Sequence, residues 1–142
     1  MTTNMLDPNS LLARLFLIRA LLAQGIFAEA IAEALTLQAM NPDASMPIAF
    51  AGFAQARSGQ QRAARATLKK LLQRSTRRYV SPYCIATIYN GLSERDAALA
   101  WLERGFEQRD PRMILLKEDL TWSKLRDDPG FLSLQKRMNL LP

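Results

Sequence analysis

The stretch Tyr79–Pro111 reads YVSPYCIATIYNGLSERDAALAWLERGFEQRDP and contains one complete helix–turn–helix unit. Its first helix is predicted to start at Ser81-Pro82, because a capping residue followed by a first-turn proline favours a helix start. Its second helix is predicted to start at Ser93, with Asp96 completing a weak form of the capping box. The unit therefore reads as one hairpin of two helices.

Key residues of this hairpin recur upstream at a spacing of 34 residues. A fixed period of this length is typical of helical repeat arrays, in which each hairpin stacks on the next. The sequence predicts an all-α fold: a solenoid of three helix-turn-helix repeats at about 11–42, 45–76 and 79–110, with a capping region over 111–142, in one domain. The recurring sets are Gly25, Gly59 and Ser93; Ala30, Ala64 and Ala98; and Ala34, Leu68 and Leu102.

Length and composition agree with one helical domain. The chain has 142 residues, 49% of them hydrophobic, and only six glycines. The lone cysteine, Cys84, excludes an internal disulfide framework, and the absence of histidine removes the usual zinc chemistry. The apolar run Leu11–Ala23 contains Arg14 and Arg19 and has no basic leader, which argues against an export signal or a membrane span. We expect a cytoplasmic protein that does not enter the membrane.

Individual helices can be placed from capping and turn residues. The sequence Asp7-Pro8-Asn9-Ser10 is predicted to open a first helix that runs to about Gln24. After Pro111 the period is lost, and Asp128-Pro129 is predicted to open a last helix. Four apolar residues of this region are expected to cover the end of the array: Trp122, Leu125, Phe131 and Leu134. The first helix of the second repeat is predicted to begin near Asp43 to Pro47 and to run to the Ser58-Gly59 turn. The other predicted helical stretches are 27–40, 61–73, 112–117 and 121–126.

These residues resemble the tetratricopeptide repeat family over about 11–111. The family pattern requires a small residue where the two helices of a repeat cross, and Ala30, Ala64 and Ala98 meet it. Gly52, Ala86, Tyr89 and Pro42 also match, whereas Ile18, Leu21, Gln55, Thr76 and Asp110 depart from the pattern. The segment from Tyr79 to Leu140, which includes LRDDPGFLSLQKRMNL, also looks like the carboxy-terminal end of repeat regions in bacterial transcriptional regulators, cyclases and protein kinases.

The resemblance implies a concave groove lined by the first helix of each repeat. Family members that clamp acidic peptide termini use Lys, Asn and Arg there, whereas this groove is mostly apolar. We expect a slot for an amphipathic or extended apolar peptide, anchored by Phe53 and Tyr83, with Arg19 or Arg57 binding a carboxylate. The alternative is that several of these residues belong to the interhelix core or are covered by a second copy. The predicted groove residues are Leu12, Leu15, Arg19, Leu22, Met46, Ala49, Phe53, Arg57, Tyr83, Thr87 and Asn90.

The first helix is apolar around nearly its whole circumference, so more than one neighbour must cover it. Pairing with its copy in a twofold homodimer is one expectation. The alternative is that residues 1–10 fold back over it, which their polarity disfavours.

The positive charge is concentrated in the second repeat. Residues 57–78 contain eight basic and no acidic side chains, whereas nine basic and nine acidic residues balance from Tyr79 onward. This basic face could bind an acidic protein partner or nucleic acid phosphates, although no aromatic residues are interleaved to stack bases. Its residues are Arg62, Arg65, Lys69, Lys70, Arg74, Arg77 and Arg78.

Catalysis has little support in the sequence. Without histidine the commonest general base is missing, and no glycine-rich phosphate loop occurs. Cys84 lies between aromatic residues on a helix and is expected to be a buried core residue. The sequence predicts a non-catalytic protein- or peptide-binding scaffold or adaptor without a cofactor. The alternative is a module of a bacterial regulator whose basic second repeat docks on an acidic protein or nucleic acid.

Overall fold

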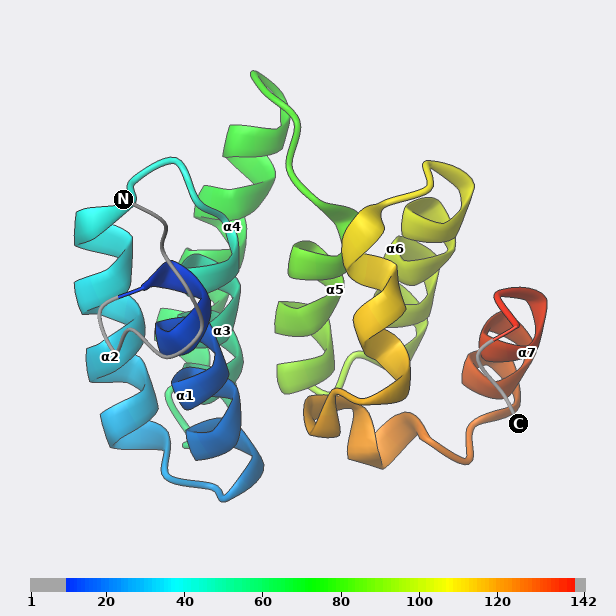
Figure 1. The fold of residues 1–142 in the computed structure, drawn as a ribbon, viewed down its shortest axis with the longest axis horizontal. Helices are drawn as coiled ribbons and strands as arrows, with labels where there is room; N and C mark the ends of the chain where they lie inside the picture. Colours follow the sequence, from blue (N-terminus) through cyan, green and yellow to red (C-terminus); the bar gives the residue numbers. More distant parts are fainter. Residues whose placement is uncertain (1–9, 140–142) are drawn as a thin grey trace.

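The computed structural model describes residues 10–139, and all regular secondary structure in this range is helical (Figure 1). An all-α fold is thus confirmed for this part of the chain. The elements are α1 (Leu11–Ala23), α2 (Phe27–Met40), α3 (Met46–Arg57), α4 (Gln61–Ser75), α5 (Pro82–Gly91), α6 (Arg95–Glu107), the 3₁₀ helices η1 (Pro111–Lys117) and η2 (Leu120–Leu125), and α7 (Pro129–Arg137).

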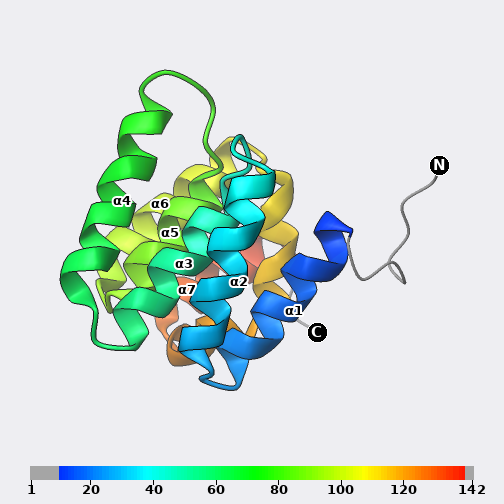
Figure 2. The same cartoon turned by 90° about the vertical axis from the view of Figure 1, so that its left-hand side faces the viewer.

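The helices join into three hairpins, α1–α2, α3–α4 and α5–α6. In Figure 1 the first hairpin and α7 lie at opposite ends of the molecule, and Figure 2 shows α1 and α2 on the face at the first end. Within this arrangement α3 is the central element, since it contacts α2, α4 and α5. The core is therefore continuous from one hairpin to the next.

The three turns inside the hairpins have the same backbone structure. Gly25, Gly59 and Ser93 all have positive φ, at 75°, 87° and 60°. After each of them the chain closes the helix with a 6→1 hydrogen bond of the Schellman type. The three bonds join Ile26 N to Leu21 O at 2.9 Å, Gln60 N to Gln55 O at 2.8 Å and Glu94 N to Tyr89 O at 3.0 Å.

The start of α6 differs from the prediction. Ser93 was expected to cap this helix, but α6 begins at Arg95, and no side chain caps its first turn. The reason is the left-handed backbone of Ser93, which closes the preceding helix α5. The capping box with Asp96 is therefore wrong. For α2, by contrast, the predicted span of residues 27–40 is confirmed.

Small residues allow the helices to approach closely. Ala30, Ala64 and Ala98 have no exposed surface. A Cβ atom added to Gly91 would lie 2.9 Å from the Cα of Phe53, so α5 packs directly on the backbone of α3 there. Gly52 plays a similar part, since a Cβ atom at this residue would lie 2.9 Å from the Ile88 side chain.

Aspartates organise the C-terminal region. Asp110, Asp119 and Asp128 each accept a backbone hydrogen bond at the start of the next helix, from Arg112 N at 3.1 Å, Thr121 N at 3.0 Å and Gly130 N at 2.8 Å. The four residues predicted to cover the array, Trp122, Leu125, Phe131 and Leu134, are buried. The Trp122 ring packs between two other aromatic rings, with its centroid 5.7 Å from that of Tyr83 and 5.9 Å from that of Phe131.

The predicted opening of the first helix falls partly outside the described residues. Ser10 caps α1, since its Oγ accepts a hydrogen bond from Ala13 N at 3.0 Å. Asp7, Pro8 and Asn9 lie outside the described range, as does all but Ser10 of the segment 1–10 that was the alternative cover of α1. Between residues 10 and 139 no helix combines the length and apolar composition that crossing a bilayer would require.

Candidate binding site

The predicted groove residues on α5 are core residues. Tyr83 and Thr87 have no exposed surface, and Asn90 is 3% exposed. Burial, together with the nearby Asp119 carboxylate, raises the pKa of the Tyr83 phenol well above its ordinary value. Contrary to the prediction, the structure does not present these three side chains to a partner.

The segment that covers them is η2. The Tyr83 hydroxyl donates a hydrogen bond to Asp119 Oδ2 and accepts one from Trp122 Nε1 at 2.9 Å. Asn90 Nδ2 donates to the Thr121 carbonyl oxygen at 2.7 Å. Because η2 also contacts α1, it crosses the face on which an open groove was predicted. The polar groups that suggested ligand contacts are satisfied within the chain.

Arg57 is held in place within the protein as well. Its guanidinium donates to the Asn90 carbonyl oxygen at 3.0 Å and lies 5.0 Å from the centroid of the Phe53 ring. Burial lowers the pKa of Arg57. Phe53 is only 4% exposed, so the two residues form a packed pair, and with Leu22 they line a hollow of about 300 Å³ beside η2. Leu22 and Ala49 are also buried.

The rest of the predicted groove forms a pocket between α1, α3 and η1. Leu12, Leu15 and Arg19 come from α1, and Met46 comes from the start of α3. The pocket has a volume of about 150 Å³, which suits one apolar side chain. The sequence missed its other wall, because the return of η1 to this face has no periodic signal. The lining residues that were not predicted are Phe16, Phe50, Arg112 and Leu115.

Two arginines give this pocket its electrostatic character. Arg19 and Arg112 are both half-buried, and neither forms an ion pair with any residue of the part that the structure describes. The Arg19 guanidinium lies 5.7 Å from the centroid of the Phe16 ring, so an aromatic face supports it. The remaining walls are apolar. Such a site favours a ligand that combines an apolar group with a negative charge.

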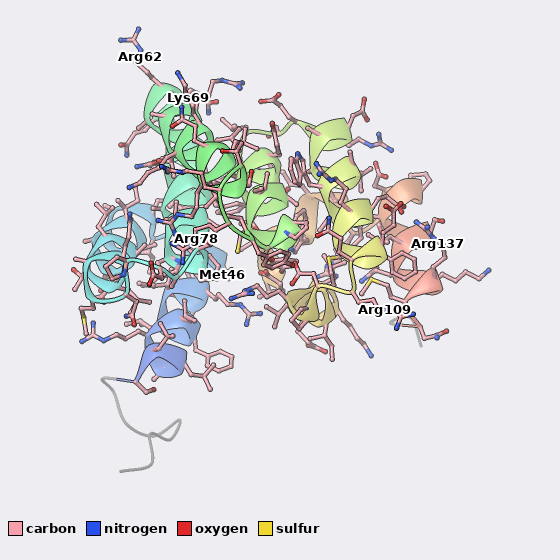
Figure 3. All side chains as sticks on the ribbon, turned by 90° about the horizontal axis from the view of Figure 1, so that it is seen from above. Met46, Arg62, Lys69, Arg78, Arg109 and Arg137 are labelled. Atoms are coloured by element: carbon pink, nitrogen blue, oxygen red, sulfur yellow. The ribbon has the colours of Figure 1, made fainter. Side chains whose placement is uncertain are left out.

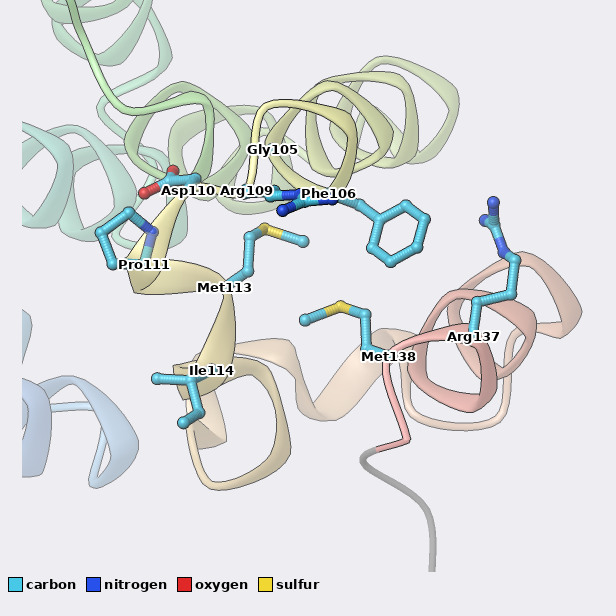
Figure 4. Close-up of a pocket in the computed structure, with 9 residues that line it drawn as sticks. All are labelled: Gly105, Phe106, Arg109, Asp110, Pro111, Met113, Ile114, Arg137 and Met138. Carbon is cyan, nitrogen blue, oxygen red and sulfur yellow. The ribbon is translucent and has the colours of Figure 1, made fainter.

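A wider hollow of about 620 Å³ lies between the end of α6, η1 and α7. In Figure 4 the side chains of Met113 and Met138 face each other across it. Arg137 at its edge is paired with Glu103 and lies 5.2 Å from the centroid of the Phe106 ring. The sequence did not indicate this hollow, and it shares no lining residue with the α1–η1 pocket.

The seven predicted basic residues divide into two groups. Arg65 pairs with Glu94 at 2.8 Å, Arg78 pairs with Asp43 at 3.1 Å, and Arg74 donates to the Pro42 carbonyl oxygen at 3.1 Å. The other four, which are all exposed, form no ion pair within residues 10–139. They are Arg62, Lys69, Lys70 and Arg77.

Cys84 has the predicted position in the core. It has no exposed surface, and its Sγ lies 3.4 Å from Met46 Sδ. Burial raises the pKa of its thiol to about 12. The thiol is therefore protonated at neutral pH and a poor nucleophile. Across residues 10–139 no group of three or more His, Cys, Asp or Glu side chains is placed to hold a metal ion.

No protein-family model matches the chain, and neither the curated proteins nor the solved structures include a significant match. The geometry of the described residues therefore carries the functional argument.

Proposed function

We propose that this protein is a non-catalytic binding module that captures a protein or peptide segment in the α1–η1 pocket. The observation that carries the proposal is an apolar pocket edged by Arg19 and Arg112, two guanidinium groups that form no ion pair within residues 10–139. A segment that places one apolar side chain beside a carboxylate would satisfy both features. The carboxylate could belong to an acidic residue or to a peptide C-terminus.

The same proposal includes a helical repeat scaffold of the tetratricopeptide type. Its support is the positive φ and the 6→1 hydrogen bond that the three turns share at a spacing of 34 residues, with buried alanines at equivalent positions in the three hairpins. In this proposal the α1–η1 pocket is one accessible part of the concave face, and the hollow beside η2 that Leu22, Phe53 and Arg57 line is another. An adaptor role in the cytoplasm, alone or within a larger regulator, would use the pocket to hold a partner.

A minimal ligand tests the proposal. We would titrate the isotope-labelled protein with N-acetyl-leucine and, in parallel, with N-acetyl-leucine amide, and follow backbone amide shifts by NMR. The acid should bind with a Kd in the millimolar range, since fragments of this size gain about 0.3 kcal/mol or somewhat more per heavy atom. The shifts should centre on Leu15, Arg19, Met46 and Leu115. The amide should bind several-fold more weakly because it carries no charge.

Two variants and a matched control separate pocket binding from general attraction to a cationic protein. Arg19→Gln and Arg112→Gln should each reduce the preference for the acid over the amide. Arg109→Gln removes an equal charge from an exposed position outside the pocket and should leave the preference unchanged. Equal binding of acid and amide, or shifts that avoid the pocket, would refute the proposal.

A further inference from the structure

A second groove lies on the opposite side of the first two hairpins, between α2 and α4. Its volume is about 500 Å³. It shares no lining residue with the α1–η1 pocket. Its walls come from α2 and the turn after it, which contribute Leu35, Gln38, Ala39 and Pro42, and from α4, which contributes Lys70 and Arg74.

The α2 side of this groove is mostly apolar, and Gln38 is its polar member. Leu35 is 49% exposed although it is a large aliphatic residue. Ala28, Ala32 and Ala39 are also exposed and lie on the same side of the helix, because their spacing of four, three and four residues follows the helical repeat. This exposed stripe has no acidic or basic member. It offers about three helical turns of apolar surface to a partner.

The α4 side is cationic, and its charged groups have few partners among the described residues. Lys70 is exposed and forms no ion pair among the described residues. Arg74 donates to backbone carbonyl oxygens, at 3.1 Å to Pro42 and 3.5 Å to Asp43, and forms no ion pair with a carboxylate of the described part of the chain. Figure 3 shows Arg62 and Lys69, which precede Lys70 in α4, on the outer side of the molecule. Leu35 and Ala39 on the α2 wall and Lys70 and Arg74 on the α4 wall thus line one groove.

We propose that this groove binds an acidic amphipathic helix of a partner protein. Apolar residues on one face of such a helix would lie on Leu35 and Ala39. Carboxylates on its flank would pair with Lys70 and Arg74, and Lys69 would add to the attraction from the crest of α4. Helix-in-groove recognition uses this combination of an apolar seam and complementary charge at its border. The phosphates of a nucleic acid duplex could pair with the cations, but a duplex offers no apolar surface to pack on the α2 residues.

The test uses the full chain and a short fluorescein-labelled helical peptide with leucines along one face and glutamates on the others. Fluorescence anisotropy should report saturable binding to the wild type. Lys70→Glu and Leu35→Glu should each weaken it by about fivefold or more, through lost charge pairing and lost apolar contact. Two controls make the same chemical changes elsewhere: Lys117→Glu on η1 and Ile114→Glu, a residue 69% exposed. Both should leave the affinity within about twofold.

Every other outcome counts against the proposal. If Lys70→Glu weakens binding but Leu35→Glu does not, the attraction is electrostatic alone and the groove is not used. If a labelled DNA duplex binds and the peptide does not, α4 is a nucleic acid surface instead. Absence of binding to both probes at low salt would also overturn it. Circular dichroism of each variant would establish that the helices are intact, and Arg112→Gln should have no effect here because it lies in the other pocket.

Discussion

Tyr83 on α5 and Asp119 before η2 are 36 residues apart in the chain, and the Tyr83 hydroxyl donates a hydrogen bond to the Asp119 carboxylate in the interior. The same hydroxyl oxygen accepts the indole N–H of Trp122. Asp119 Oδ1 accepts from the backbone and the hydroxyl of Thr121, at 3.0 and 2.8 Å. These bonds attach the C-terminal segment to the third hairpin.

Removal of the Tyr83 hydroxyl should therefore destabilise the whole chain. In Tyr83→Phe, one oxygen of Asp119 and the indole N–H of Trp122 lose a partner while they stay buried. A buried unsatisfied polar group costs about 1–3 kcal/mol, so the free energy of unfolding should fall by at least that amount. Urea denaturation followed by circular dichroism measures the change. Tyr79→Phe is the control, because Tyr79 is 62% exposed, and its effect should stay within about 0.5 kcal/mol. A neutral Tyr83→Phe would mean that the contact is not formed in solution.

The buried thiol of Cys84 predicts a loss of stability at high pH. Its pKa is about 12 in the folded protein against an ordinary value of 9.0. The contribution of the protonated thiol is fully present below about pH 9 and is lost as the pH rises toward 12, because only the unfolded state releases the proton early. At pH 11 the loss should be on the order of 2 kcal/mol. Cys84→Ala should lower stability at pH 7 through the cavity, yet decline less between pH 8 and 11 than the wild type. Parallel curves for the two proteins would contradict the prediction.

The approach of α5 to α3 makes Gly91 sensitive to a single added methyl group. In Gly91→Ala the new Cβ would lie 2.9 Å from Phe53 Cα and 3.1 Å from Phe53 O, so one helix must move. Overpacking of this kind costs about 1–3 kcal/mol, which exceeds the gain of up to about 1 kcal/mol from better helix propensity. Gly52→Ala is the matched comparison, because its new Cβ meets the Ile88 side chain and no backbone atom. Thermal unfolding should therefore rank Gly91→Ala as the less stable variant, and the reverse order would argue against this helix contact.

Because the three hairpin turns share a positive φ, adding a glycine at one of them and removing a glycine at another should change the stability of the protein in opposite directions. Ser93→Gly should stabilise the protein by about 0.5–1 kcal/mol, because glycine adopts positive φ without strain. Gly59→Ala should destabilise it by a similar amount. No atom lies within 4 Å of the Cβ position at Gly59, so this second effect would come from backbone strain alone. Chemical denaturation of both variants is the measurement, and effects of the same sign would show that the turns are not equivalent.

The sequence predicts the hairpins because local signals determine them. Ser10 and the first-turn prolines of α3 and α5 mark where helices begin, and Gly25 and Gly59 mark where they end. The prediction fails locally at Ser93, where a serine takes the glycine conformation. The sequence did not predict the long-range contacts. The attachment of η2 to α5 depends on Tyr83, Asn90 and Asp119, which are aperiodic and far apart in sequence. The one available signal was polar residues on the inner side of α5, which were interpreted as ligand contacts.

The outer surface of α1 predicts weak self-association. Leu12, Phe16 and Leu17 are 45–47% exposed, and Ala20 lies beside them on the same side of the helix. An antiparallel twofold pair of α1 helices with its axis at Phe16 would set Leu12 of each copy against the small Ala20 of the other. We expect the apparent mass measured by light scattering to rise with protein concentration. Because Leu12 and Phe16 also line the α1–η1 pocket, N-acetyl-leucine should compete with this association.

Cysteine crosslinking tests the axis of this pair directly. The native Cys84 is fully buried, so a cysteine introduced on the surface is the only reactive thiol among the residues that the structure describes. Phe16→Cys lies at the proposed axis, where two copies of the same residue meet, and should form a disulfide dimer quickly under mild oxidation. Thr36→Cys is exposed on α2 and should crosslink only at the rate of random collision. If both variants crosslink equally slowly and the wild type stays monomeric at high concentration, the exposed apolar surface of α1 does not pair with its copy.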